Sequence, residues 1–244
     1  MKYQLNFTRL FLVCLLTSVF FSCNSSHENN INNLLEIDNA TKVAIARLDY
    51  ENQMMYAQLE IFNVHHEDSL DIPVYSSFMR VRKQVYEMES YLTQIKRGLI
   101  GAVEGTDAPT GDTLRYNLLK SPMEVKAVDD YLFGTNAGAS VASQLSLKIT
   151  QLQETLNGLP SSPGYSYPFN VILKGDFSAN TSSKDTWEAA TLKGQPLIQV
   201  LLLLNSIQLQ INVAENSKLH RYVDEHKLMH ESKPKTDADA EVKK

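Results

Sequence analysis

Cysteine is nearly absent from this chain of 244 residues, since only Cys14 and Cys23 occur and both lie near the N-terminus. The remaining residues therefore offer no disulfide, no zinc–thiolate cluster and no cysteine nucleophile. Glycine and proline are also scarce, with 10 and 8 residues, and 23 basic residues are outnumbered by 28 acidic ones. This composition is typical of a folded protein. The acidic balance argues against a nucleic-acid-binding protein, which would present a basic face.

A short apolar stretch near the N-terminus predicts an export signal. Lys2 and Arg9 precede the apolar segment at residues 10–21, LFLVCLLTSVFF. A helix of that length spans roughly 18 Å, well short of the ~30 Å hydrocarbon core of a membrane. A signal peptide over residues 1–22 therefore fits better than a transmembrane anchor.

The end of this stretch resembles a bacterial lipobox, because Ser22, a small residue, directly precedes Cys23. We therefore predict that Cys23 is lipidated and that its acyl chains hold the protein to a membrane. An ordinary secretory signal with an incidental cysteine is the alternative. Residues 23–33 are predicted to be a flexible tether, and residues 231–244, which have almost no apolar content, to be a disordered tail.

Heptad spacing of apolar residues predicts four long helices, at residues 39–63, 78–102, 138–157 and 196–229. The clearest seam contains Phe78, Val81, Val85, Met88, Leu92, Ile95, Leu99 and Ala102. Such a pattern is typical of bundle or coiled-coil packing. Charged residues, Glu89 and Lys96 among them, fall on the other faces of this helix and are expected to be solvated. Asn52 interrupts the seam of the first helix.

The segments between the long helices are shorter and more polar. Residues 121–124, Ser-Pro-Met-Glu, have the form of a capping box and predict a short helix that ends near Phe133. Residues 158–195 form a long connection, in which the alternation at residues 169–174 allows a short strand or hairpin. The predicted fold is an all-α, elongated up-down four-helix bundle over residues 34–230, with a small irregular or β insertion before the last helix.

No constellation of residues in the sequence predicts catalysis. The G-x-S-x-G and G-x-x-x-x-G-K-[ST] motifs do not occur. His226 and His230 are one helical turn apart and near His220, so they could share a metal, but no Cys partner or H-E-x-x-H order supports a site. We therefore predict no catalytic residue, no metal and no cofactor, and we expect the seams to lack buried polar clusters.

The last long helix has more apolar residues than one core stripe requires. Ile198, Leu202 and Leu209 lie on an additional face, which must be covered. Residues 158–195 could cover it, but a second subunit is favoured, so a homodimer is expected. Trp187, the single tryptophan, is expected to pack on the end of the bundle, with contact to a partner protein as the alternative.

The segment around this tryptophan carries a family resemblance. Trp187, the run Gly194-Gln195-Pro196-Leu197 and then Gln208, Asn212 and Glu215 follow the order of the GldM (PorM) N-terminal domain. Asp129-Asp130-Tyr131 is similar to the middle of that domain, and the resemblance covers roughly residues 34–223. It implies a helical domain that dimerises in the periplasm, in a family that pairs with GldL in the gliding-motility and type IX secretion machinery of Bacteroidetes.

The sequence departs from this family pattern in two respects. A lipobox is expected in place of the N-terminal transmembrane helix, and the later β-rich domains are not expected. We therefore expect a lipid-anchored periplasmic structural or interaction protein, associated with secretion or gliding proteins, that binds a membrane but no nucleic acid. A periplasmic ligand-binding or sensory bundle is the alternative.

Overall fold

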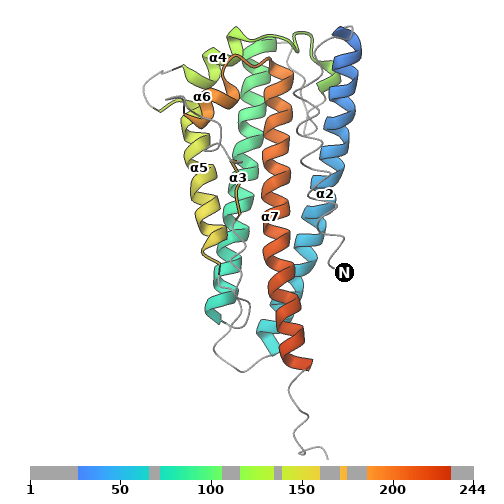
Figure 1. The fold of residues 1–244 in the computed structure, drawn as a ribbon, viewed down its shortest axis with the longest axis vertical. Coiled ribbons are helices and arrows are strands. Elements are labelled where there is room, and N and C mark those ends of the chain that lie inside the picture. Colours follow the sequence, from blue (N-terminus) through green and yellow to red (C-terminus); the bar gives the residue numbers. More distant parts are fainter. Residues whose placement is uncertain are drawn as a thin grey trace, which may run out of the picture.

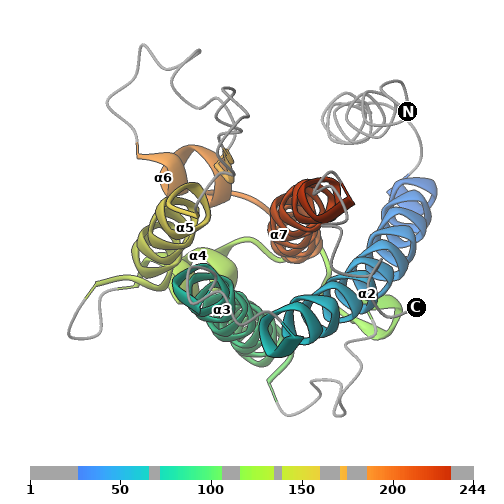
Figure 2. The ribbon, with the colours of Figure 1, turned by 90° about the horizontal axis from the view of Figure 1, so that it is seen from below.

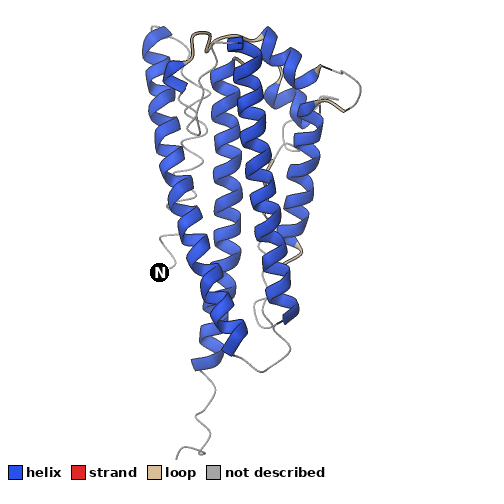
Figure 3. Cartoon of the chain, turned by 180° about the vertical axis from the view of Figure 1, so that it is seen from behind, coloured by secondary structure: helices blue, strands red, loops and turns tan. Residues whose placement is uncertain are grey.

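The computed structural model of the protein describes residues 27–65, 72–105, 116–134, 139–159, 171–174 and 186–231. Its secondary structure is helical, and the described residues contain no strand (Figure 3), so the all-α prediction is confirmed. The long helices lie side by side (Figure 1); they are α2 (His27–His65), α3 (Ile72–Glu104), α5 (Val141–Asn157) and α7 (Leu197–Glu231). The short elements lie at one end; they are η2 (Tyr116–Leu118), α4 (Lys126–Phe133) and α6 (Trp187–Leu192).

The direction of the last long helix differs from an alternating up-down order. In Figure 1, α2 runs downward, α3 upward and α5 downward, and α7 then runs downward as well. The first three long helices alternate as predicted, whereas α7 is parallel to α5. The connection at 158–195 therefore joins opposite ends of the bundle and is more than a local insertion.

The described segment Val171–Lys174 within this connection shows why the predicted strand does not form there. Asn157 of α5 accepts a hydrogen bond from the Val171 amide at 2.7 Å and donates to its carbonyl oxygen at 3.1 Å. Gln153, one turn earlier, accepts from the Leu173 amide at 2.8 Å. Side chains of a helix thus satisfy the backbone groups that a neighbouring strand would otherwise satisfy. Residues 169 and 170 lie outside the described residues.

Helix α2 begins earlier than predicted, at His27, so its first turns lie within the predicted tether of residues 23–33. Helix α3 extends beyond the predicted 78–102 at both ends, and it ends at Glu104, where Gly105 directly after it adopts a positive φ of 61°. Such a left-handed residue is a common C-terminal stop that glycine adopts without steric cost. Within α3, Gly98 permits a close approach of α4, since a Cβ atom there would overlap the Tyr131 hydroxyl group.

The predicted capping box at residues 121–124 is wrong, because α4 begins only at Lys126 and its N-cap residue is Val125, whose side chain makes no capping hydrogen bond. The Glu124 carboxylate accepts from the Ala127 amide at 3.1 Å. The backbone carbonyls of Pro122 and Glu124 accept from the amides of Ile198 and Leu197, at 3.0 and 2.9 Å. The two amides belong to the first turn of α7, where backbone donors have no partner within the helix. Residues 122–124 therefore fix the start of α7.

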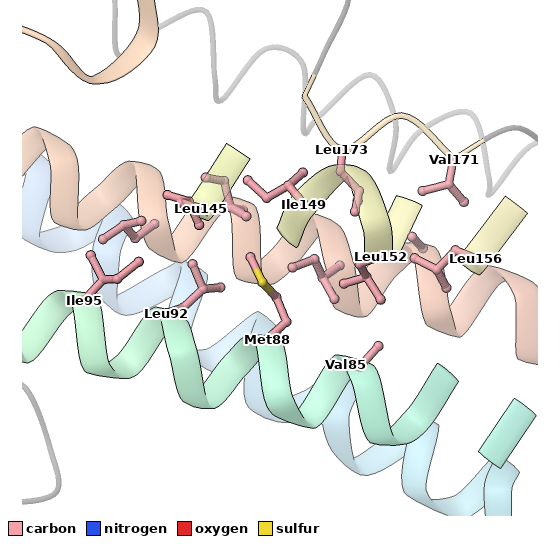
Figure 4. Close-up of a cluster of buried hydrophobic side chains, with 14 of the residues drawn as sticks. Val85, Met88, Leu92, Ile95, Leu145, Ile149, Leu152, Leu156, Val171 and Leu173 are labelled. Carbon is pink, nitrogen blue, oxygen red and sulfur yellow. The ribbon is translucent and has the colours of Figure 1, made fainter. Parts of the chain in front are cut away.

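An apolar seam, defined by buried side chains of α3 and α5, forms one half of the core (Figure 4). The close-up places four residues of α3 opposite four of α5, with Val171 and Leu173 beside them. Leu92, Leu145, Ile149 and Leu156 are completely buried. The eight helical residues of this seam are Val85, Met88, Leu92, Ile95, Leu145, Ile149, Leu152 and Leu156.

Helix α7 lies between α2 and α5 when the bundle is seen from below (Figure 2), and its most extensive contact is with α2. The segment Leu197–Val223 is long and apolar enough to cross a membrane by length and composition. However, 56% of its most apolar window is buried inside the protein, and that burial is typical of the central helix of a bundle.

Candidate interaction site

The residues predicted from sequence as contact or anchoring sites do not come together in one place. Cys23 lies outside the described residues. Trp187 is buried at the end of the bundle, with the Lys174 ammonium 5.5 Å from its ring centroid. Ile198 and Leu202 are buried within a single chain, and Leu209 is partly buried. The apolar face of α7 therefore needs no second subunit to cover Ile198 and Leu202, and the homodimer stays a prediction that requires another surface.

The histidines considered as metal ligands do not form a described site. The side chains of His226 and His230 lie outside the described residues. Within the part of the chain whose side chains are described, there is no group of three or more histidine, cysteine or acidic residues that could hold a metal ion.

A row of polar side chains follows the face of α7 that meets α2 and α3. Its members, Asn205, Gln208, Asn212 and Glu215, are separated by three, four and three residues. This is the spacing of a heptad seam, so all four lie on one face of the helix. Three of them are almost fully buried, and Gln208 is partly buried. Together with their partners on α2, α3 and η2, we call them the polar seam.

Glu215 is the centre of the lower part of the polar seam. Its two carboxylate oxygens accept hydrogen bonds from different residues of α2, the Tyr56 hydroxyl at 2.7 Å and the Asn52 amide nitrogen at 2.9 Å. The Asn52 side chain also donates to the Asn212 carbonyl oxygen at 3.3 Å and accepts from Asn216 at 2.9 Å. One asparagine of α2 therefore contacts three residues of α7.

Helix α3 joins the polar seam through two residues that the sequence places on a solvated face. Glu89 accepts from the side-chain amides of Asn212 at 2.7 Å and Gln208 at 3.3 Å. Lys96, which is only 4% exposed, donates to Gln208 Oε1 at 2.9 Å. The expectation that Glu89 and Lys96 are solvated is therefore wrong, because both lie beside the apolar seam of α3 on the side that faces α7.

The upper part of the polar seam contains an ion pair between a buried carboxylate and a partly exposed ammonium group. Asp38 of α2 accepts a hydrogen bond from the Asn205 side chain of α7 and lies 2.6 Å from the Lys42 ammonium. That ammonium lies 3.9 Å from the centroid of the Tyr116 ring, a cation–π geometry. The Asn205 amide also approaches the Tyr116 hydroxyl oxygen at 3.4 Å. This cluster fixes η2 against the first half of α2.

Burial shifts the pKa values of the ionisable groups in the polar seam. Loss of solvent raises the pKa of Glu215 to about 7, although the hydrogen bonds from Tyr56 and Asn52 act in the opposite direction. Burial lowers the pKa of Lys96 to about 8, with the nearby Lys42 charge acting in the same direction. Burial and the neighbouring Glu215 raise the pKa of the Tyr56 hydroxyl, which stays protonated.

The polar groups of the seam satisfy one another. In the described part of the chain, the one buried side-chain polar atom without a hydrogen-bond partner is Gln84 Oε1, which lies outside the seam. The expectation that the seams lack buried polar clusters is wrong. The sequence did contain a sign of this cluster, since Asn52 interrupts an apolar seam and Gln208, Asn212 and Glu215 follow heptad spacing. What the sequence did not show is that these positions face one another across helices.

A closed polar network of this kind specifies how helices pair. A buried polar group costs free energy unless its partner is in place, so a shifted or alternative pairing of α2 with α7 would leave several groups unsatisfied. Buried polar residues fix register in this way in coiled coils. The polar seam is therefore suited to holding three helices in one alignment rather than to binding a substrate.

Comparison with known proteins gives a family match for most of the chain. The family model described as the GldM N-terminal domain matches residues 31–225, which include α2 to α6 in full or nearly so and most of α7. No curated protein matches the sequence significantly.

Proposed function

We propose, from the premise that this chain belongs to the GldM N-terminal domain family, that the protein is a lipid-anchored structural component facing the periplasm. It associates with gliding or type IX secretion machinery, and it holds a partner or a second copy rather than acting on a substrate. The family is one of structural components, not of enzymes. The family match over residues 31–225 is the single observation that carries the association with this machinery, whereas the lipid anchor rests on the lipobox resemblance at Cys23.

The interior of the bundle supports a structural role over ligand binding. A ligand-binding or sensory bundle needs polar groups directed at a ligand, whereas the buried carboxylate of Glu215 is directed at Tyr56 and Asn52. At the other end of the polar seam, the Asp38 carboxylate likewise accepts a hydrogen bond from Asn205 of the same chain. The sensory alternative gains no support from these contacts.

Membrane attachment is the first part of the proposal to test. Lipidation of Cys23 would place the anchor four residues before α2 begins at His27. We expect Cys23→Ser to move the protein from the membrane fraction to the soluble periplasm, because the acyl chains supply the anchoring free energy. Unchanged sedimentation of the variant with membranes would disprove lipid anchoring, and unmodified thiol at Cys23 by mass spectrometry would do the same.

Association with the machinery needs a direct test in the native cell. We expect the tagged full-length chain, purified from crosslinked membranes, to enrich GldL or other type IX components by mass spectrometry. The matched control is an unrelated periplasmic lipoprotein with the same tag. Equal enrichment in both samples would contradict the association, and normal gliding and secretion in a deletion strain would show that neither process requires the protein.

A further inference from the structure

Four polar side chains of α5 form a row that binds an extended segment of the chain. Ser146, Thr150, Gln153 and Asn157 are separated by four, three and four residues, so they lie on one face of the helix. This face adjoins the apolar one, because each of the four directly follows a buried residue of the apolar seam. We call these four residues the ladder, and we call the segment that they bind, Val171–Lys174, the strap.

The ladder holds the strap mainly by its backbone. Asn157 accepts from the Val171 amide and donates to the Val171 carbonyl oxygen, and Gln153 accepts from the Leu173 amide. Backbone groups of this kind are common to every peptide sequence. In peptide recognition by strand addition, main-chain hydrogen bonds give affinity and pockets for alternate side chains give specificity. The ladder makes the main-chain contacts from a helix instead of a strand.

Alternate side chains of the strap supply the specificity. Val171 and Leu173 are buried beside α5 (Figure 4), whereas Ile172 between them is 57% exposed. The Lys174 ammonium then donates to the two hydroxyl groups of the ladder, at 2.7 and 2.8 Å. The strap is therefore recognised as an extended segment with the pattern apolar-x-apolar-Lys.

The connection that contains the strap is much longer than its path requires. Helix α5 has 17 residues and is about 25 Å long, and α6 lies near the end of α5 opposite to Asn157 (Figure 1). About eight extended residues would span that distance, whereas residues 158–186 join the two helices. The strap can therefore leave α5 without displacing α6.

We propose that the ladder is a binding site for an extended apolar-x-apolar-Lys segment of a partner protein, and that the strap fills this site until such a segment replaces it. Exchange is favoured over simple release, because an empty site would expose the apolar surface that Val171 and Leu173 cover. This deepens the proposed function, on which it rests for the existence of a partner, by stating the chemistry of the segment that the partner presents.

The strap has an advantage over a free peptide, because it is tethered to the site. Tethering through a short flexible linker gives an effective concentration on the order of millimolar. A free segment should therefore bind weakly to the unsubstituted chain and more tightly once the apolar contacts of the strap are removed. The double substitution Val171→Ser, Leu173→Ser removes these contacts and leaves the ladder intact. We call this chain the strap variant.

The single tryptophan makes binding measurable. The probe is a dansyl-labelled peptide with the sequence of residues 169–176, FNVILKGD. Its bound lysine would lie near Trp187, since the Lys174 ammonium lies 5.5 Å from the centroid of that ring. We expect energy transfer from Trp187 to dansyl in the full-length strap variant, with a dissociation constant at least tenfold lower than in the unsubstituted chain. Ile172→Ser, at the exposed strap position, is the matched control and should behave as the unsubstituted chain.

Two controls separate binding by the ladder from nonspecific apolar binding. Gln153→Ala together with Asn157→Ala, added to the strap variant, should weaken binding at least tenfold, whereas Gln151→Ala, at an exposed position of α5, should not. Methylation of the peptide nitrogens that correspond to Val171 and Leu173 removes the two backbone donors, so it should weaken binding as well.

Absence of energy transfer in the strap variant, or equal affinity of the methylated and unmethylated peptides, would overturn the proposal. Equal affinity of the strap variant and the unsubstituted chain would also overturn it. If the strap variant loses its helical circular dichroism, Leu173→Ala replaces it in the comparison, with the same expected direction. If the peptide does not bind while GldL or other type IX components still co-purify, the binding site is wrong and the proposed function stands. Peptide binding without such co-purification would leave the site in place and contradict the association.

Discussion

Two contacts in the bundle are stabilised by different physics. Helix α3 packs on α5 through the apolar seam, with Leu92 opposite completely buried residues such as Leu145 and Ile149 (Figure 4). Helix α2 meets α7 through the polar seam, with hydrogen-bonded groups such as Asn52 and Glu215. Apolar packing is non-directional and tolerates repacking, whereas a buried hydrogen bond requires one geometry. The difference indicates that the apolar seam supplies stability and the polar seam supplies alignment.

The largest expected effect comes from placing a charge in the apolar seam. Leu92 is completely buried, and Leu92→Asp would bury an unpaired carboxylate, which costs several kcal/mol. We expect the variant to unfold or to lose most of its thermal stability in a circular dichroism melt. Glu87→Ala, at an exposed position of the same helix, should change the free energy of unfolding by about 0.5 kcal/mol or less. Similar melting of the two variants would show that the buried face of α3 is assigned incorrectly.

Removing one partner from the polar seam should have a smaller but clear effect. Asn52→Ala leaves the Glu215 carboxylate without one of its two donors and leaves the Asn216 amide without its acceptor. We expect the free energy of unfolding to fall by about 1–3 kcal/mol in urea denaturation. Hydrogen exchange should increase in α2 more than in α5, because the lost bonds hold α2 to α7. Equal increases in both helices would contradict a separate role for the polar seam.

In the acidic range, the pH dependence of stability should come from Glu215 of the polar seam, whose pKa is raised by burial. Between pH ~4.3, the ordinary pKa of a glutamate, and pH about 7, Glu215 keeps its proton only in the folded state. The folded state then binds more protons, so the free energy of unfolding falls as pH rises through this window. The total fall should be on the order of 4 kcal/mol at most, at about 1.4 kcal/mol per pKa unit.

Glu215→Gln tests this directly, because its uncharged amide should flatten the dependence between these pH values. Lys96 acts in the opposite direction. Its pKa is lowered to about 8, so stability should rise again as pH increases from about 8 toward the ordinary lysine value of ~10.4. An unchanged pH profile in the Glu215→Gln variant, measured by urea denaturation at each pH, would contradict the assignment of the acidic window to Glu215.

The smallest effect is expected on the outer surface of α2. Tyr50 is 64% exposed, so Tyr50→Glu should change the free energy of unfolding by no more than about 0.5 kcal/mol. A urea titration measures this change. A loss of several kcal/mol would show that Tyr50 packs within its own chain.

Much of the bundle could be predicted from the spacing of apolar residues. The seam from Phe78 to Leu99 is buried as its heptad pattern indicates, because this period places those residues on one face of a helix. The strand expected near residue 171 failed for a different reason. Its alternation was local, and the actual partners of its backbone, Asn157 and Gln153, belong to a helix. Local patterns do not identify which distant side chains will satisfy a backbone group.

The amino-acid sequence by itself determined the helices, their apolar faces and the family, because each depends on periodicity or on residue order along one segment. Only the tertiary structure decided the direction of α7, the burial of Lys96 and the meeting of Asn52 with Glu215. A polar residue at a helix edge has the same local pattern whether it faces water or another helix. Its environment is decided by which helices pack together, since buried polar groups are stable only when a partner from another helix completes their hydrogen bonds.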